Sequence, residues 1–363
     1  MKIVTIVGAR PQFIKAAAVS RVIREKHTEI LVHTGQHYDN NMSDIFFEEL
    51  HIPKPDINLG VGSGSHAKQT AEMMIGIEEI LLKEEPDYLM VYGDTNSTLA
   101  GAIAASKIHV PIIHVEAGLR SFNMRMPEEQ NRILTDRISS LLLCPTDVAV
   151  DNLKKEGLTE GVYNVGDVMC DAVLYYSKLL DEKPSGYYFS HLQGLFSNVR
   201  EVESWYLATV HRAENTDSLK KVKEILDAFE QLDAPVIFPV HPRTKGMVKE
   251  LVDSIGYKNT IFVEPMGYLD MLYFVKNAKK AVTDSGGLQK ETYILDTPCV
   301  TVRDQTEWVE TLIGNHNILA KPNAKDIVDK VMNTVIDYEK KANYYGNGNA
   351  AGKICELISK KEN

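Results

Sequence analysis

Short apolar runs alternate with amphipathic segments along almost the whole chain, and this alternation constrains the fold more than any other feature. Such runs are typical of strands buried on both faces of a parallel sheet, and the segments between them are typical of crossover helices. Ten strands are predicted at residues 3–7, 29–33, 88–92, 112–115, 141–144, 206–210, 236–240, 260–263, 281–283 and 299–302. Helices are predicted at residues 11–25, 97–106, 219–231 and 268–276. The sequence therefore predicts an α/β chain with two doubly wound, Rossmann-like domains.

The length of 363 residues suits two domains of roughly 150 to 200 residues each. We expect them at residues 1–167 and 168–352. The stretch 182–203 has no clean periodicity and is interpreted as irregular or as a helical excursion. Residues 347–352 are rich in Gly and Asn and are expected to break the chain before a last helix at 353–361.

Composition and charge argue against several kinds of partner. The net charge of −10 argues against nucleic acid or an anionic membrane surface. Four widely spaced cysteines form no Cys-x-x-Cys pair, which suits a reducing, cytosolic location. We expect no signal peptide, because the first residues read as a strand, and no apolar run approaches the length of a membrane span. Metal binding is not supported, because no group of His, Cys and Asp has ligand spacing.

Polar residues follow the predicted strands at the points where the strands end. They occupy residues 8–15, 34–37, 93–98, 116, 211–215, 241–243, 284–287 and 303–306. In open α/β sheets the ligand crevice lies outside the carboxyl ends of the strands. We therefore expect these residues from both domains to face one cleft between the domains.

The stretch from His114 to Arg132 is the most informative of these segments. Glu116 follows the apolar run 110–113, and Glu128, Glu129 and Arg132 come within 16 residues of it. Charged groups gathered at the end of a buried strand indicate a reaction centre. The alternative for Glu129 and Arg132, three residues apart, is an ion pair on a surface helix. For Glu116 this alternative is weaker, because a carboxylate beside a buried strand must be paired or used.

Residues 283–291 read as a strand, a glycine turn and the start of a helix. Gly286 and Gly287 would let the backbone approach phosphate oxygens, and the helix N-terminus offers free N–H groups. Glu291, one turn further, would accept hydrogen bonds from ribose hydroxyls. The alternative is an ordinary capped turn with Asp284 or Ser285 as N-cap. The same logic applies to Arg10 before Pro11, whose guanidinium would bind a diphosphate, but no dinucleotide-binding glycine pattern follows the first strand.

His211 and His241 each end a predicted strand. A lone histidine is more often structural than catalytic. Arg212 beside His211 favours a functional role, whereas His241 with Arg243 is interpreted as a positioning element.

These motifs, taken in order, resemble those of the non-hydrolysing UDP-N-acetylglucosamine 2-epimerases over nearly the whole chain. The motifs are Gly8–Pro11, Gly93–Thr95, His114–Arg120, Pro127–Glu129, His211–Arg212, His241–Pro242 and Asp284–Gly287. The resemblance implies a fold of the glycosyltransferase B class, with a C-terminal helix (353–363) returning to the first domain. It also implies a cytosolic homodimer that takes a UDP-sugar, needs no cofactor and supplies surface polysaccharide precursors.

The resemblance further implies roles for individual residues. Proton transfer at the sugar C2 is expected from Asp94, Glu116 and Glu128, with Asp94 the first choice for abstraction. His211 is counted with the catalytic residues and also fits a diphosphate clamp. The residues expected to bind UDP or substrate are Arg10, Lys15, Arg132, His241, Arg243, Ser285, Gly286, Gly287 and Glu291.

Two regions depart from the commonest family pattern. Residues 36–42 and 60–69 differ where many members bind a second UDP-sugar as activator, and 306–310 reads Thr-Glu-Trp-Val-Glu. Both changes resemble a subgroup that acts on UDP-2,3-diacetamido-2,3-dideoxyglucuronate, whose extra carboxylate would need a cation such as His66, Lys68 or Arg125. The more distant alternatives are a glycosyltransferase, a hydrolysing epimerase and a catalytically silent sugar-nucleotide sensor.

Overall fold

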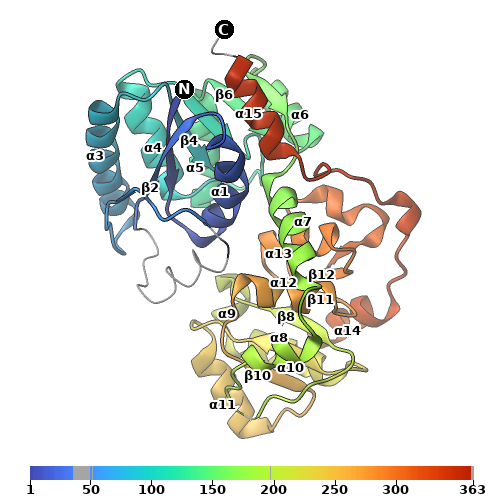
Figure 1. Cartoon of the computed structure of the whole chain (residues 1–363). Coiled ribbons are helices and arrows are strands. Elements are labelled where there is room, and N and C mark those ends of the chain that lie inside the picture. Colours follow the sequence, from blue (N-terminus) through green and yellow to red (C-terminus); the bar gives the residue numbers. More distant parts are fainter. Residues whose placement is uncertain (36–49, 51, 197, 361–363) are drawn as a thin grey trace. The chain divides into compact units, whose positions relative to one another are not determined.

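The computed structural model describes residues 1–35, 50, 52–196 and 198–360, and for Arg10 it describes the backbone alone. The chain forms two compact units, which we call unit 1 (Met1–Ala172 with Asn343–Asn363) and unit 2 (Val173–Ala342). Each unit is a parallel sheet covered by helices (Figure 1). The prediction of two Rossmann-like halves is therefore confirmed.

The sheet of unit 1 has the strand order β3-β2-β1-β4-β5-β6-β7. Its strands are β1 (Lys2–Val7), β2 (Thr28–His33), β3 (Ile57–Asn58), β4 (Tyr88–Tyr92), β5 (Ile112–Val115), β6 (Leu141–Cys144) and β7 (Val162–Asn164). All neighbours pair in parallel. From β1 the chain adds strands toward one edge of the sheet (β2, β3) and then, from β4 on, toward the other edge. The boundary between β1 and β4 is therefore the topological switch point, where such sheets bind ligands.

Helices of unit 1 begin where the sequence offers good N-terminal residues. They are α1 (Arg10–Ile23), α3 (His66–Glu84), α4 (Asn96–Lys107), α5 (Pro127–Ile138), α6 (Asp147–Lys155) and α15 (Ala350–Lys360). Ser65, Thr95 and Thr146 accept hydrogen bonds from the first turns of α3, α4 and α6. Pro11 stands in the first turn of α1, where its missing N–H costs nothing. Helix α7 (Val168–Leu180) begins in unit 1 and ends in unit 2.

The C-terminal helix α15 begins three residues before its predicted start at 353. The prediction that residues 347–352 break the chain is therefore wrong for its last three residues. The carboxylate of Asp171 accepts hydrogen bonds from the N–H groups of Ala350 and Ala351, at 2.9 and 2.7 Å. A side chain distant in the sequence thus accepts from two of the free N–H groups at the start of α15.

Unit 2 is a second parallel sheet with the order β10-β9-β8-β11-β12-β13. Its strands are β8 (Tyr206–Thr209), β9 (Val236–Pro239), β10 (Thr260–Val263), β11 (Ala281–Thr283), β12 (Cys299–Thr301) and β13 (Asn317–Leu319). Its helices are α8 (Ser185–His191), α9 (Ala213–Thr216), α10 (Leu219–Glu230), α11 (Lys245–Ile255), α12 (Tyr268–Lys276), α13 (Gly286–Ile294), η1 (Val309–Asn315), α14 (Ala324–Asn333) and η2 (Tyr338–Lys340). The switch point of this sheet lies between β8 and β11.

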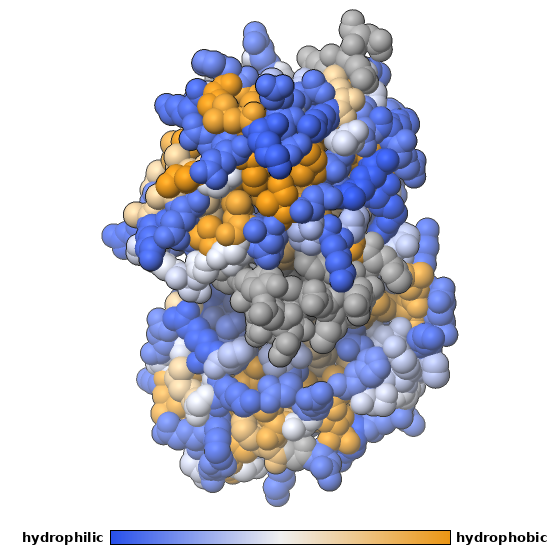
Figure 2. Space-filling view, turned by 60° about the vertical axis from the view of Figure 1, so that its left-hand side comes forward, coloured by the Kyte–Doolittle hydropathy of each residue, from blue (hydrophilic) through white to orange (hydrophobic). Residues whose placement is uncertain are grey.

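All ten predicted strands are present, and the structure adds β3, β7 and β13. The stretch 182–203 contains α8, so its interpretation as a helical excursion is confirmed for residues 185–191. No helix within the described residues is long and apolar enough to cross a membrane. The face shown in Figure 2 is mostly hydrophilic, with apolar residues in separate patches.

Candidate functional site

The switch point of unit 1 depends on Gly8, the residue that follows β1. A Cβ atom at this position would lie 2.0 Å from Ser97 Oγ and 2.4 Å from Thr34 Oγ1, so no side chain fits there. The side chain of Gln12 accepts hydrogen bonds from the N–H groups of Gly8 and Ala9, and it donates to the carbonyl of Tyr92. The start of α1 is thereby held against the end of β4.

Glu116 and Lys15 form a buried ion pair at the carboxyl end of the sheet. Lys15 Nζ lies 2.7 Å from Glu116 Oε1, and each residue is only 8% exposed. Glu116 has a φ of +73°, a left-handed conformation that is uncommon for a residue other than glycine. The expectation that Glu116 must be paired or used is met by pairing. A strained backbone that holds a buried carboxylate is typical of functional sites.

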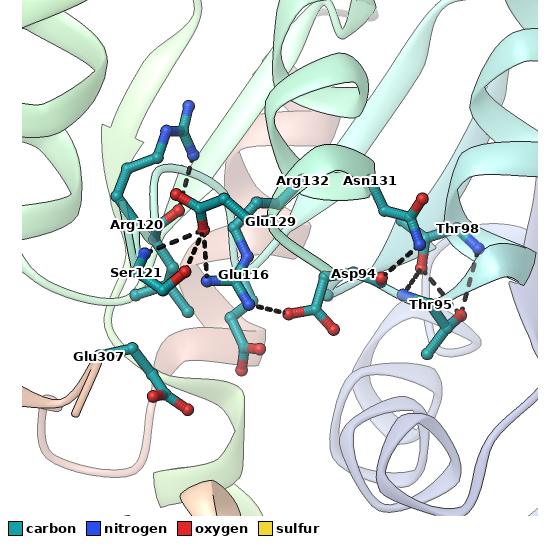
Figure 3. A network of polar contacts seen from close by, with 12 residues as sticks. Asp94, Thr95, Thr98, Glu116, Arg120, Ser121, Glu129, Asn131, Arg132 and Glu307 are labelled. Atoms are coloured by element: carbon teal, nitrogen blue, oxygen red, sulfur yellow. Dashed lines mark hydrogen bonds and ion pairs between the residues drawn. The ribbon is translucent and has the colours of Figure 1, made fainter. Parts of the chain in front are cut away.

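Arg132 of α5 lies between two carboxylates, as Figure 3 shows. It donates one hydrogen bond to Asp94, which follows β4 after Gly93, and another to Glu129 at 3.2 Å. Asn131 Nδ2 also donates to the Asp94 carbonyl at 2.9 Å. The side chains of Arg132 and Glu129 are 6% and 1% exposed, so the alternative of a surface ion pair is wrong.

Glu129, rather than Glu128, is the carboxylate that organises the start of α5. Besides Arg132, it accepts hydrogen bonds from the N–H and hydroxyl of Ser121 and from the N–H of Phe122. Glu128 is exposed in the first turn of α5. The sequence did carry a signal for this difference, because Glu129, Arg132 and Asp136 recur at helical spacing and all three are buried.

Asp284 joins the two loops at the switch point of unit 2. This carboxylate, fully buried, accepts hydrogen bonds from the N–H groups of His211 and Arg212 and from the side chain of Asn215. Arg212 Nε donates in return to the Asp284 carbonyl at 2.9 Å. The cap of α13 is Ser285, whose hydroxyl accepts from the N–H of Leu288. Asp284 is therefore a link between β8 and β11, a role that the sequence did not indicate.

His211 is oriented by the same carboxylate. Its Nδ1 lies 3.3 Å from Asp284 Oδ1, and its ring centroid lies 5.7 Å from that of His241. Burial lowers the pKa of His211; Asp284 opposes this shift, and His241 and Arg212 add to it. Burial and Arg243 likewise lower the pKa of His241. Both rings are therefore predominantly neutral at neutral pH in the free protein, and an anion bound close to either ring would raise its pKa.

The glycine turn before α13 leaves little room on one side. A Cβ atom at Gly286 would lie 2.6 Å from Glu307 Oε1, whereas a Cβ at Gly287 would meet only Ser285 Oγ at 3.9 Å. Glu307 is held by Arg303, which donates to it at 3.0 Å. The turn thus brings bare backbone next to a fixed side chain. The N–H groups at the N-terminus of α13 suit a phosphate near Gly287, where a Cβ atom would meet no carboxylate within 4 Å.

The remaining predicted residues take different positions. Glu291 is buried in α13 and hydrogen-bonds Tyr268, whose pKa is raised by burial and by this carboxylate. Arg243 is exposed and pairs with Asp217 at 2.7 Å. The side chain of Arg10 and the divergent segment 36–42 lie outside the described residues. Across the part of the chain that the structure describes, no three His, Cys, Asp or Glu side chains are placed to hold a metal ion.

Comparisons with known proteins agree on one family. A family model described as UDP-N-acetylglucosamine 2-epimerase matches residues 21–359. A Methanococcus maripaludis protein named UDP-N-acetylglucosamine 2-epimerase homolog is 52% identical over 99% of both chains. A Pseudomonas aeruginosa protein named UDP-2,3-diacetamido-2,3-dideoxy-D-glucuronate 2-epimerase is 48% identical over 99% of this chain and 100% of that one.

A solved structure matches the chain closely as well. The crystal structure of Methanocaldococcus jannaschii UDP-GlcNAc 2-epimerase in complex with UDP-GlcNAc and UDP has a TM-score of 0.88 and 41% identity, covering 99% of this chain and 100% of that chain. The predicted glycosyltransferase B-like fold class is thereby confirmed.

Proposed function

Because the chain belongs to the UDP-N-acetylglucosamine 2-epimerase family, we propose that it interconverts UDP-N-acetylglucosamine and UDP-N-acetylmannosamine. The C2 hydrogen of this sugar is not next to a carbonyl, so a base removes it only as the C1–O bond to UDP breaks. The electrons of the C2–H bond form a C1–C2 double bond, and the C1–O pair leaves on the diphosphate. Return of UDP to C1, with protonation of C2 on the opposite face, gives the epimer.

The observation that carries the proposal is the set of carboxylates held at the carboxyl end of the unit 1 sheet. Asp94 follows β4 and Glu116 follows β5, and Arg132 and Lys15 pair with them. Proton transfer at two faces of one carbon needs more than one positioned carboxylate, each fixed by its neighbours. We assign abstraction to Asp94 and keep Glu116 and the exposed Glu128 as the other proton-transfer candidates.

Unit 2 offers the groups that a departing diphosphate needs. We assign the diphosphate to His211, Ser285 and the two glycines that follow it, because a helix N-terminus and a ring ready to accept a proton both stabilise developing negative charge. Glu291 is assigned to the ribose hydroxyls, with Tyr268 fixing its carboxylate.

Incubation with UDP-N-acetylglucosamine in heavy water tests the proposal directly. We expect the C2 proton signal of the sugar to disappear as signals of UDP-N-acetylmannosamine grow. Release of UDP and free sugar would instead indicate a hydrolysing epimerase. A folded protein that binds UDP but leaves the C2 proton intact would contradict the proposal for this substrate.

The role of Asp94 is tested by Asp94→Asn, with Asp87→Asn as the matched control. Asp87 precedes the other end of the same strand and accepts a hydrogen bond from the N–H of Lys2. We expect Asp94→Asn to stop C2 exchange while UDP still binds, and Asp87→Asn to keep both properties. Full exchange in Asp94→Asn would remove Asp94 as the base.

A second candidate substrate is UDP-2,3-diacetamido-2,3-dideoxyglucuronate, favoured by the 48% identity to the P. aeruginosa protein of that name. Of the side chains suggested for the extra carboxylate, His66 is joined to Asp94 by hydrogen bonds: its ring contacts Asn96, which Asn131 links to the Asp94 carbonyl. The side chain of Lys68 is 70% exposed and lies 3.8 Å from a glutamate. We therefore expect His66→Gln to lower kcat/KM for the uronate and to leave the neutral substrate unaffected.

We also propose that the chain acts as a cytosolic homodimer. Its four cysteines are buried and form no disulfide with one another, which suits a reducing compartment. In helix α3, Ile75 and Leu82 are 61% and 60% exposed. This helix is labelled at the left of Figure 1, the side that faces the viewer more directly in Figure 2. Light scattering of the wild type and of Ile75→Glu tests this, because a dimer built on this helix would dissociate in the variant.

A further inference from the structure

His114 is buried in β5, next to the turn that carries Asp94. The ring and its partner Asp136 are completely shielded from solvent. His114 Nε2 lies 2.7 Å from the carbonyl oxygen of Gly93, and Nδ1 lies 2.7 Å from Asp136 Oδ1. Gly93, with a φ of +62°, forms the left-handed turn between β4 and Asp94.

The partners of the ring determine where its protons lie. A carbonyl oxygen only accepts, so Nε2 must carry a hydrogen. The other oxygen of Asp136 already accepts from the N–H of Gly118 at 3.2 Å and from the guanidinium of Arg120 at 2.7 Å. With these donors on Oδ2, Oδ1 is left to accept from Nδ1, and the 2.7 Å distance there is typical of a strong hydrogen bond. Both ring nitrogens therefore donate.

Arg120 continues this network from Asp136 to Glu156, whose side chain is 29% exposed. Arg120 makes a second, two-pronged contact with Glu156, at 2.7 and 2.8 Å. Two cations thus face two carboxylates, which is the condition under which buried charges are tolerated. The thiol of Cys144 also lies close enough to Asp136 and Arg120 to interact with their charges.

From this geometry we propose that His114 is a positioning residue: a doubly protonated ring that fixes the Gly93 carbonyl and thereby aims Asp94. The inference rests on the proposed function, in which Asp94 exchanges the C2 proton. Asp136 belongs to α5, which also carries Arg132, the partner of Asp94. One buried ring therefore connects the strand end before Asp94, the strand that ends before Glu116, and the helix that supplies Arg132.

The position of Asp94 is then set from both sides. Its backbone is held through Gly93 by His114, and its side chain is held by Arg132. The N–H of Gly93 donates in turn to the carbonyl of Val115 at 3.0 Å, so the turn is fixed through both of its polar backbone groups. A catalytic group displaced by about 1 Å can lose up to about a hundredfold in rate. Loss of the His114 contact should consequently lower turnover and leave substrate binding unchanged.

Two variants separate the contact from the charge. His114→Gln puts a single amide group in place of the ring, so the side chain can no longer bridge the Gly93 carbonyl and Asp136. Asp136→Asn keeps every hydrogen bond, because the amide can donate to Nδ1 while its oxygen accepts from Gly118 and Arg120, but it leaves the ring neutral. Ser20→Ala is the matched control, since it removes a buried hydrogen bond to Glu29 (2.9 Å) between α1 and β2 in the same unit.

The experiment combines steady-state C2 exchange, UDP binding and nitrogen NMR of the protein labelled in histidine. His114→Gln should lower kcat by between about ten- and a hundredfold with KM and UDP affinity changed less than about twofold. In the wild type both ring nitrogens of His114, assigned by their absence from His114→Gln, should carry a hydrogen, and in Asp136→Asn only Nε2 should carry one.

Several results would overturn the inference. These are a His114 ring in the wild type with a hydrogen on only one nitrogen, a kcat in His114→Gln no lower than in Ser20→Ala, or a rise in KM at unchanged kcat. If His114→Gln fails to fold, two other measurements test the inference: the number of hydrogens on the ring in the wild type, and the kcat of Asp136→Asn. That kcat is expected to fall by less than the kcat of Asp94→Asn. A wild type that shows the doubly protonated ring but no C2 exchange would refute the proposed function alone.

Discussion

The affinity of the protein for UDP should depend on pH through His211. In the free protein burial lowers the pKa of this ring, so it is neutral above its ordinary value of 6.5. With Nδ1 directed at Asp284, the neutral ring presents a bare Nε2 that cannot donate to a phosphate. Binding of the diphosphate should therefore be coupled to uptake of a proton by His211.

The size of the effect follows from simple electrostatics. A phosphate oxygen about 4 Å from an imidazolium interacts by about 1 kcal/mol in water and about 4 kcal/mol at a protein surface. The His211 side chain is 40% exposed, so solvent screening places the value toward the lower limit, and about one unit of pKa is expected. Affinity should be constant below the pKa of the free ring, fall as pH rises from there to the pKa of the bound ring, and lose roughly tenfold in total.

Calorimetric titration of UDP between pH 6 and 8.5, in pairs of buffers with different ionisation enthalpies, counts the protons taken up. UDP itself titrates near the low end of this range, so the informative quantity is the difference between the wild type and His211→Gln. We expect the variant to bind UDP with fewer protons taken up and a flatter pH dependence. His241→Gln should keep the dependence, because the ring that faces Asp284 is still present. Equal proton uptake in the wild type and His211→Gln would refute the assignment of His211 to the diphosphate.

Three further predictions concern single substitutions. Lys15→Met should leave the Glu116 carboxylate buried without the Lys15 cation, and should therefore lower the free energy of unfolding in urea by about 3 kcal/mol or more. The variant should also lose most C2 exchange, and an unchanged free energy of unfolding would contradict the importance of this pair. Gly286→Ala should weaken UDP binding by displacing the carboxylate that its methyl group would meet at 2.6 Å, whereas Gly287→Ala, which meets nothing closer than 3.9 Å, should bind UDP normally. Burial lowers the pKa of His33 from 6.5 to about 4, so between these pH values the unfolded chain binds a proton that the folded chain does not. The free energy of unfolding should therefore fall by about 3 kcal/mol as the pH drops from 6.5 to 4. In urea unfolding at several pH values, His33→Gln should lack this part of the decrease.

The sequence predicted the sheets well because their central strands are buried on both faces. The strands around each switch point, β1, β4, β8 and β11, are almost continuous apolar runs, a pattern that needs no tertiary information. The strands that were missed are two or three residues long and include polar residues. They lie at sheet edges, where burial on one side leaves no clear period in the sequence.

For the candidate site, the sequence identified residues that follow strands but not the side chains that hold them. Asp94 and Glu116 could be singled out because each comes directly after an apolar run. Whether Glu128 or Glu129 is held in place depends on which side of α5 is buried. The spacing of Glu129, Arg132 and Asp136, three and four residues apart, indicated the buried side. The role of Asp284 depends on β8 lying beside β11 in the sheet, a pairing between segments more than 70 residues apart that no local pattern reveals.

Both units fix the loop at their switch point with a buried charged side chain. In unit 1 the ring of His114 holds the carbonyl of Gly93, and in unit 2 the carboxylate of Asp284 holds the N–H groups of His211 and Arg212. Buried charges of this kind contribute little to stability compared with apolar residues of the same volume. Their benefit lies in preorganisation, because backbone and side chains that are already oriented need not rearrange when charge develops on a reacting group. The conformation of Glu116 fits this view, since a left-handed backbone at a buried carboxylate is the kind of local strain that functional sites hold.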